Sequence, residues 1–160
     1  MTIERVILDD DSRGTLPPFI EADREQAVAD LAAANTFSVA GRDGEKIDGP
    51  YVLHLAISDG RLIFDIRARD DAPLIAIGLA LGPFRRLVKD YQMLVDSHIK
   101  AVEEGREARI QAIDMGRRGL HDEGAKLMTE RLAGKIDIDF DTARRLFTLV
   151  CVLAQRISAR

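Results

Sequence analysis

The fold is decided by one stretch of sequence, Asp141-Thr142-Ala143-Arg144-Arg145-Leu146-Phe147-Thr148-Leu149-Val150-Cys151-Val152-Leu153. In its last eight residues only Thr148 is polar, so a helix over residues 146–153 has no face suited to water. A helix that is apolar all round is buried, either in its own core or against a partner. We therefore expect residues 146–153 to form the central helix of the chain.

This helix begins with a pair of adjacent arginines, and the sequence contains three such pairs: Arg85-Arg86, Arg117-Arg118 and Arg144-Arg145. If Gly82 and Asp141 are N-caps, the first and third pairs occupy the third and fourth positions of their helices. Cations at these positions oppose the helix dipole, at a cost of about 0.3–1 kcal/mol each. We expect a negatively charged group to compensate them.

Two kinds of negative group could do so. The free N–H groups of a helix N-terminus and the planar guanidinium groups of arginine both bind phosphate or carboxylate ligands. Alternatively, the arginines pair with the protein's own acids, such as Asp137, Asp139 and Asp141. Proteins supply their own carboxylates more often than they bind a ligand, and exposed pairs of this kind are common. Both interpretations stay open at this point.

Residues 114–124 form the densest cluster of polar residues and glycines in the chain. A glycine-flanked arginine pair is able to form a backbone nest for an anion, although the spacing fits neither phosphate-loop fingerprint. The alternative is that the glycines mark a tight contact between helices. Arg117 lies on the apolar stripe of this segment, which predicts a partly buried arginine with an acidic partner. The candidate anion-binding residues are therefore Arg85, Arg86, Arg117, Arg118, His121, Arg144 and Arg145.

The first half of the chain has the patterns of strands. Residues 51–58 and 61–67 both alternate in polarity and are joined by Asp59-Gly60, which predicts a hairpin. Residues 3–8 are short and β-branched, and the nearly all-apolar residues 73–81 are typical of a strand covered on both faces. We expect an antiparallel sheet of about four strands.

The second half has a helical period. Helices are expected over residues 19–35 and 84–102. Another is expected after Gly105, with an apolar stripe over residues 110–127 and a weak point near Gly116 and Gly119. A short extended piece at residues 135–141 precedes the final helix, with Asp141 as its N-cap. The fold class is thus α+β, one domain spanning residues 1–160, with helices from the C-terminal half packed on the sheet.

Composition limits the class of protein. A length of 160 residues is typical of one domain. The net charge of −4, from 23 basic and 27 acidic residues, argues against binding nucleic acid by charge alone. No apolar run approaches the ~20 residues of a membrane span. The single cysteine, Cys151, fits a reducing compartment, so we expect a cytoplasmic protein.

No metal, cofactor or catalytic constellation is indicated. The acidic runs that begin at Asp9 and Asp137 both lack the glutamate that a calcium loop places at its twelfth position. Cys151 has no activating base nearby in the sequence, which favours a small buried side chain over a nucleophile. The sequence therefore favours a protein that is not an enzyme.

Several motifs resemble a bacterial family of about this length in the UPF series of uncharacterised proteins. They include GPFRRLVKDY at residues 82–91, AIDMGRRGLH at residues 112–121 and DFDTARRLFTL at residues 139–149. The resemblance spans nearly the whole chain. It implies no assigned activity, cofactor or catalytic residue.

Three hypotheses of function follow. The first is a cytoplasmic protein that acts through protein partners, as a homodimer, because its final helix is so apolar. The second is a small anion- or phosphate-binding protein that uses the paired arginines at helix N-termini. The third is a nucleic-acid-associated protein, which requires the arginines on one exposed basic face. The mutual distance of the three arginine pairs distinguishes among them.

Overall fold

The computed structural model describes residues 2–9 and 16–158, with side chains described up to residue 155. The chain forms, in order, β1 (Ile3–Leu8), α1 (Pro18–Ala33), β2 (Phe37–Ala40), β3 (Lys46–Ile47), β4 (Tyr51–Ser58), β5 (Arg61–Arg67), β6 (Pro73–Ala80), a 3-10 turn η1 (Gly82–Phe84), α2 (Arg85–Glu103), α3 (Glu107–Leu132), β7 (Ile136–Ile138) and α4 (Phe140–Ser158). The expected α+β class is confirmed, because strands dominate the first half and helices the second. The acidic turn expected after β1 lies in residues 10–15, outside the described residues.

The main sheet has four strands in the order β1-β4-β5-β6. The hairpin between β4 and β5 is confirmed, and its turn residues Asp59 and Gly60 have φ angles of 52° and 72°. The prediction of an antiparallel sheet was wrong for one pair, since β1 runs parallel to β4. Parallel neighbours need a long crossover, and here α1 and the strands β2 and β3 supply it.

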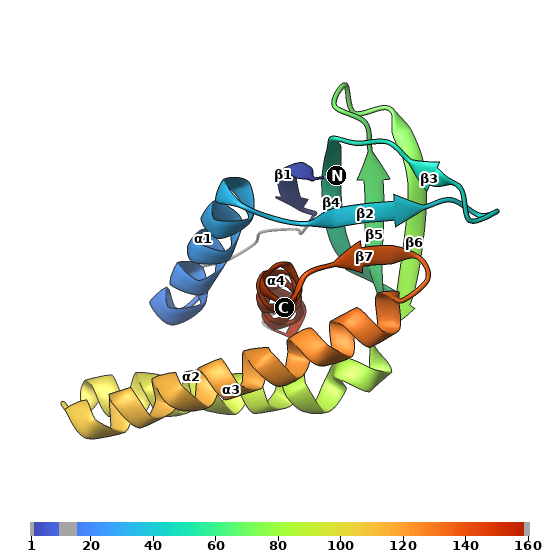
Figure 1. Cartoon of the computed structure of the whole chain (residues 1–160). Helices are drawn as coiled ribbons and strands as arrows, with labels where there is room; N and C mark the ends of the chain where they lie inside the picture. Colours follow the sequence, from blue (N-terminus) through green and yellow to red (C-terminus); the bar gives the residue numbers. More distant parts are fainter. Residues whose placement is uncertain (1, 10–15, 159–160) are drawn as a thin grey trace.

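A second, smaller sheet of order β3-β2-β7 crosses in front of the first (Figure 1). Tyr51 joins the two sheets: its hydroxyl donates to the Ile47 carbonyl and accepts from the Val39 N–H at 3.3 Å. Its ring also packs edge-on against Phe37, with centroids 5.7 Å apart. Strand β7 of this second sheet leads directly into α4, so these contacts of Tyr51 lie close to the start of α4.

Helix α4 lies between the sheets and the antiparallel pair formed by α2 and α3 (Figure 1). All residues from Leu146 to Leu153 are at most 7% exposed, and seven of these eight belong to the hydrophobic core. The prediction of a buried central helix is confirmed. Its apolar surface is covered by this chain's own α1, α3 and sheet residues.

Strand β6 differs from the prediction. It is an edge strand, because only β5 pairs with it among the described strands, and its side chains are covered on one face only. Ile77 and Leu79 face the core, whereas Ala76, Gly78 and Ala80 are exposed. The run looked doubly buried because its solvent-facing positions also carry apolar or small residues.

Helix α3 runs without a break from Glu107 to Leu132, which confirms one helix through Gly116 and Gly119. The close helix contact lies at Gly124 instead, where a Cβ atom would stand 2.3 Å from the ring of Phe147 on α4. At Gly119 a Cβ atom would meet no described atom within 4 Å. The glycine of this segment that matters for packing is therefore Gly124.

The predicted N-caps were displaced. Asp139, not Asp141, precedes α4, and its Oδ1 accepts the Thr142 N–H at 2.8 Å. Burial acts to raise the pKa of the Asp139 carboxyl, but hydrogen bonds from Thr142 and Thr36 hold that pKa below its usual value. Gly82 opens the 3-10 turn, and α2 begins at Arg85. Helix α4 thus reaches its arginines in its second turn, where the dipole is weaker.

Within residues 2–9 and 16–158, no helix is both long enough and apolar enough to cross a bilayer.

Candidate functional site

Two of the three arginine pairs converge. Arg117 and Arg118 on α3 lie at the same pocket as Arg144 and Arg145 on α4. His121 lies there too, one turn after Arg117. The structure thus brings five of the seven candidate residues to one pocket, although 23 residues separate His121 from Arg144 along the chain.

We call this cavity the arginine pocket. It has a volume of about 370 Å³ and lies where α1, α3 and α4 meet. Its lining residues are Asp23, Gln26, Ala27, Asp30, Arg117, Arg118, His121, Arg144, Arg145 and Thr148. Nine of these ten are polar, so the pocket suits a charged or strongly hydrogen-bonding ligand.

Asp23 is a buried acid that lines the pocket. It is only 8% exposed, and it accepts hydrogen bonds from the Tyr91 hydroxyl at 2.6 Å and from Arg117 Nη1 at 2.8 Å. Burial raises the pKa of this carboxyl, although the bonds from Tyr91 and Arg117 act to lower it. Burial and the neighbouring Asp23 also raise the pKa of Tyr91, which stays a hydrogen-bond donor.

Arg117 is shared between two acids, as its position on the apolar stripe predicted. Its Nη1 bonds Asp23 on α1 and its Nη2 bonds Asp114 one turn earlier on α3. The guanidinium also lies 5.7 Å from the ring centroid of Phe19, within the range of a cation–π contact. Its buried Nε has no hydrogen-bond partner among the described residues.

His121 is the most unusual side chain of the pocket. It is 5% exposed and lies between the rings of Tyr91 and Phe147, each with its centroid 6.0 Å away. Burial, with a smaller contribution from the charges of the nearby Arg117 and Arg144, lowers its pKa to about 4. The imidazole is therefore neutral at pH 7, and its Nε2 has no hydrogen-bond partner in the described part of the chain.

The arginines of α4 are held less firmly than Arg117. Arg144 Nε is 2.7 Å from the Asp122 carboxylate but makes no hydrogen bond with it, because its N–H does not point at the oxygen. Arg145 reaches the Ala34 carbonyl at 3.4 Å, and its Nε stays 3.8 Å from Asp30. Both of these Arg145 distances exceed the 2.7–2.9 Å of strong charge-assisted hydrogen bonds.

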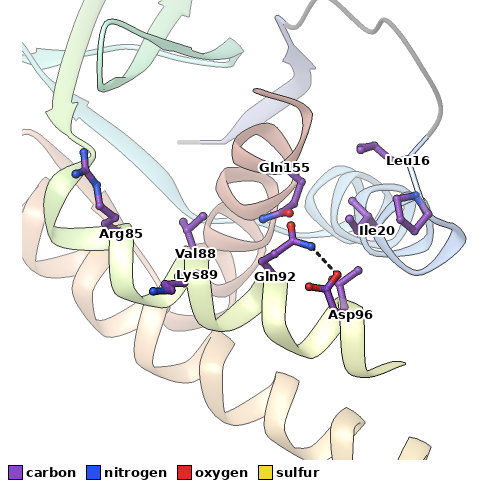
Figure 2. Close-up of a pocket in the computed structure, with 10 residues that line it drawn as sticks. Leu16, Ile20, Arg85, Val88, Lys89, Gln92, Asp96 and Gln155 are labelled. Atoms are coloured by element: carbon purple, nitrogen blue, oxygen red, sulfur yellow. Dashed lines mark hydrogen bonds between the residues drawn. The ribbon is translucent and has the colours of Figure 1, made fainter. Parts of the chain in front are cut away.

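The pair Arg85-Arg86 does not join the other two. Arg86 is 64% exposed and pairs with Asp90 and Glu123. Arg85 lines a different groove of about 560 Å³ between α1, α2 and α4, at the opposite end from Leu16 (Figure 2). This groove is larger than the arginine pocket, but aliphatic side chains line much of it. We place the candidate site at the arginine pocket, because charged groups and unpaired buried nitrogens concentrate there.

Sequence patterns did not identify Asp23 and Tyr91 as site residues. Tyr91 lies on the apolar stripe of α2 and was assigned to the core, where its ring does lie. Asp23 interrupts the narrow apolar face of α1, between Ile20 and Ala27. An acid on the buried face of a helix was the signal that could have indicated its role.

Cys151 and the two other histidines, His54 and His98, lie outside the pocket. Cys151 is completely buried, and burial raises the pKa of its thiol. His54 contacts Asp71 at 3.0 Å on the outer face of the sheet, and the ring of His98 packs 4.5 Å from that of Phe19. In the part of the chain that the structure describes, no three histidine, cysteine or acidic side chains gather as a metal site would require.

Comparison with known proteins places the chain in a family. The sequence model of the uncharacterised protein family UPF0262 matches residues 1–156. The chain belongs to the UPF0262 family. This confirms the resemblance drawn from the sequence motifs, and it adds no assigned activity.

Its relatives are bacterial proteins of similar length. A UPF0262 protein of Granulibacter bethesdensis is 65% identical over 157 residues, which cover 96% of this chain and 89% of the relative. One of Acidiphilium cryptum is 58% identical, covering 96% of this chain and 93% of its own. One of Maricaulis maris is 52% identical, covering 98% and 96%. No solved structure matches this chain significantly.

Proposed function

We propose that this UPF0262 protein binds a small anion of the phosphate or carboxylate class in the arginine pocket. The observation that carries the proposal is the convergence of four arginines from two helices on one polar cavity. Asp23 and Asp30 also line the cavity, and His121 is neutral, so two positive charges are in excess on its walls. Such an excess favours a bound anion.

Arg145 is the group best placed to receive the ligand. Its present contacts are long, at 3.4 Å to the Ala34 carbonyl and 3.8 Å to Asp30. An anion between Arg145 and Arg144 would give shorter, charge-assisted hydrogen bonds with the same guanidinium groups. The ligand would take the place that Asp30 fills only loosely.

His121 provides a second point of recognition. Its Nε2 is buried at the pocket without a hydrogen-bond partner among the described residues. A buried polar group left unpaired costs about 1–3 kcal/mol. A neutral imidazole nitrogen either donates or accepts a hydrogen bond, so a polar atom of the ligand would remove this cost once the side chains that cover Nε2 shift to admit it.

The acids around the pocket offset its positive charge. Asp114 and Asp122 pair with the arginines from outside the lining, so the whole cluster is close to neutral. The excess of two charges applies to the lining residues alone, and the preference for an anion rests mainly on the guanidinium donors that line the cavity. The nucleic-acid alternative has less support, because Arg85 and Arg86 lie apart from the other pairs.

The hypothesis of a protein partner loses the observation that motivated it. Helix α4 is buried within its own chain and offers no apolar face to a partner between Leu146 and Leu153. A homodimer and a cytoplasmic location stay predictions. The location rests on the single cysteine, Cys151.

The test is a titration with inorganic phosphate, acetate and citrate, followed by calorimetry and by the shift in the unfolding midpoint. Arg145→Gln is the test variant, and Arg85→Gln is the matched control from outside the pocket. We expect Arg145→Gln to weaken binding by about tenfold or more, because a hydrogen bond to a charged group contributes about 1.5–3 kcal/mol. The control should bind as the wild type does.

Two results would overturn the proposal. One is that none of these anions binds the wild-type protein at millimolar concentration. The other is that both variants lose affinity equally, which would indicate a general charge effect. Urea denaturation of Arg145→Gln shows whether the variant is folded, so a loss of binding is not confused with unfolding.

A further inference from the structure

The outer edge of β6 has the composition of a covered strand, although it is exposed. Pro73–Ala80 contains no charged residue, and its solvent-facing side chains are Leu74, Ala76 and Ala80, with Gly78 between them. Leu74 is 38% exposed. An edge strand without charged side chains is open to pairing with another chain.

The opposite edge of the sheet is protected: the Asn35 side chain accepts the Ile3 N–H at 2.8 Å and donates to the Ile3 carbonyl at 2.9 Å. Strand β1 carries Glu4 and Arg5, both of which are exposed. Charged side chains on an edge strand prevent it from pairing with another molecule. Strand β6 has such protection only at its start, where Pro73 lies opposite an irregularity in register between Ile66 and Arg67. From Ile75 to Ala80 the edge is regular and uncharged.

The register fixes which backbone groups of β6 are unpaired. The Leu81 N–H donates to the Gly60 carbonyl at 3.0 Å, immediately beyond the Arg61–Ala80 pair. Antiparallel ladders alternate, so Leu79 and Ile77 direct their N–H and C=O groups toward β5. The groups of Ala76, Gly78 and Ala80 face away from β5, and no other described strand pairs with them.

Gly78 has no local reason to be glycine. Its φ is not in the left-handed region, and a Cβ atom would stand 3.6 Å from Ile63 and 3.9 Å from Arg61, which is ordinary contact. Glycine inside a strand weakens it, and it often marks a place where another backbone approaches closely. Within this chain no second described strand pairs with the outer edge of β6.

We propose that β6 pairs with β6 of a second copy of this chain, in antiparallel orientation across a twofold axis, to form one continuous eight-stranded sheet. A twofold axis makes identical strands antiparallel. In the register centred on Gly78, this glycine faces Gly78 of the second copy and Ala76 faces Ala80. The outward backbone groups of Ala76, Gly78 and Ala80 are then all paired, and the side chains that face one another across the pair are small.

The test is sedimentation of the full-length wild type and of Gly78→Lys. The wild type should sediment at about twice the 17.7 kDa mass of one chain. Gly78→Lys places two lysines directly opposite each other, and like charges at this position destabilise the pair. We expect the dimer to dissociate into monomers at the same concentration. The room around Gly78 lets the lysine side chain fit within the monomer.

Ala112→Lys is the matched control. Ala112 is also exposed, and with Ala108, Gly116 and Gly119 it forms a stripe of small residues on α3 that offers another face for a second copy. We expect Ala112→Lys to stay dimeric. A monomeric wild type, a dimer that survives Gly78→Lys, or a dimer that Ala112→Lys dissociates would each overturn the proposal.

Hydrogen exchange locates the interface independently. In the wild type the amides of Ala76, Gly78 and Ala80 should exchange slowly, and in Gly78→Lys the amides of Ala76 and Ala80 should exchange quickly. The amides of Ile77 and Leu79 face β5 and should stay protected in both proteins. A dimer in which the Ala76 and Ala80 amides exchange quickly would contradict pairing through β6.

Discussion

The contact between Gly124 and Phe147 predicts opposite effects for one substitution at two positions of α3. In Gly124→Ala the new Cβ atom would stand 2.3 Å from the ring of Phe147. Carbon atoms in contact are normally about 3.5–4.0 Å apart, so the ring has to move by about 1 Å or more. Phe147 is fully buried against the rings of Phe84 and His121 and has little room for this.

The matched variant is Gly119→Ala, which introduces the same methyl group five residues earlier in the same helix. No described atom lies within 4 Å of its Cβ position. Alanine is favoured over glycine in a helix by about 0.5–1 kcal/mol, so this variant should be more stable than the wild type. The same gain applies at Gly124, where overpacking opposes it with a cost of about 1–3 kcal/mol.

The helix preference cancels between the two variants, so their difference measures the overpacking alone. We expect Gly124→Ala to be less stable than Gly119→Ala by about 1–3 kcal/mol in urea denaturation, with equal slopes. Combining Gly124→Ala with Phe147→Leu should recover part of the loss, since the smaller side chain leaves room for the methyl group. If Gly124→Ala and Gly119→Ala were equally stable, the close packing of α3 on α4 described here would be wrong.

Two further predictions concern the pocket and the start of α4. Protonation of His121 favours the unfolded chain, because its pKa is about 4 when folded and about 6.5 when unfolded. Its contribution to stability is complete above pH 6.5 and is lost as the pH falls toward 4, to a total of about 3 kcal/mol; His121→Asn should flatten this slope, and an unchanged slope would contradict the burial of the neutral ring. Asp139→Ala should cost about 1 kcal/mol through loss of the N-cap, whereas Asp141→Ala should cost less; the reverse order in urea denaturation would restore Asp141 as the cap.

The features that sequence predicted correctly depend on neighbours along the chain. The hairpin needs only two alternating runs and the Asp59-Gly60 turn, and the burial of residues 146–153 needs only their composition. The parallel pairing of β1 with β4 could not be predicted in this way. It depends on the path of the chain through α1 and the second sheet, and no local pattern records that path.

The arginine pocket shows the same limit. Arg117 was expected to be partly buried with an acidic partner, and both properties are present. Asp114 lies one turn away and could have been named, but Asp23 is 94 residues distant on α1. The convergence of Arg117-Arg118 with Arg144-Arg145 depends likewise on how α3 packs against α4. Sequence proposed the residue types, and the packing of the helices decided which of them meet.

The final helix explains why the core and the pocket lie so close together. Leu146 and Phe147 of α4 face the hydrophobic core, while Arg144, Arg145 and Thr148 line the pocket. The arginine pair of α4 was predicted to lie in the first turn, but it lies in the second turn, where the helix dipole opposes cations less. The reason to place a ligand here is therefore the convergence of this pair with Arg117 and Arg118, while Phe147 on the same helix packs against the ring of His121 beside them. Changes at Arg145 should therefore affect ligand binding, and changes at Phe147 should affect both stability and binding.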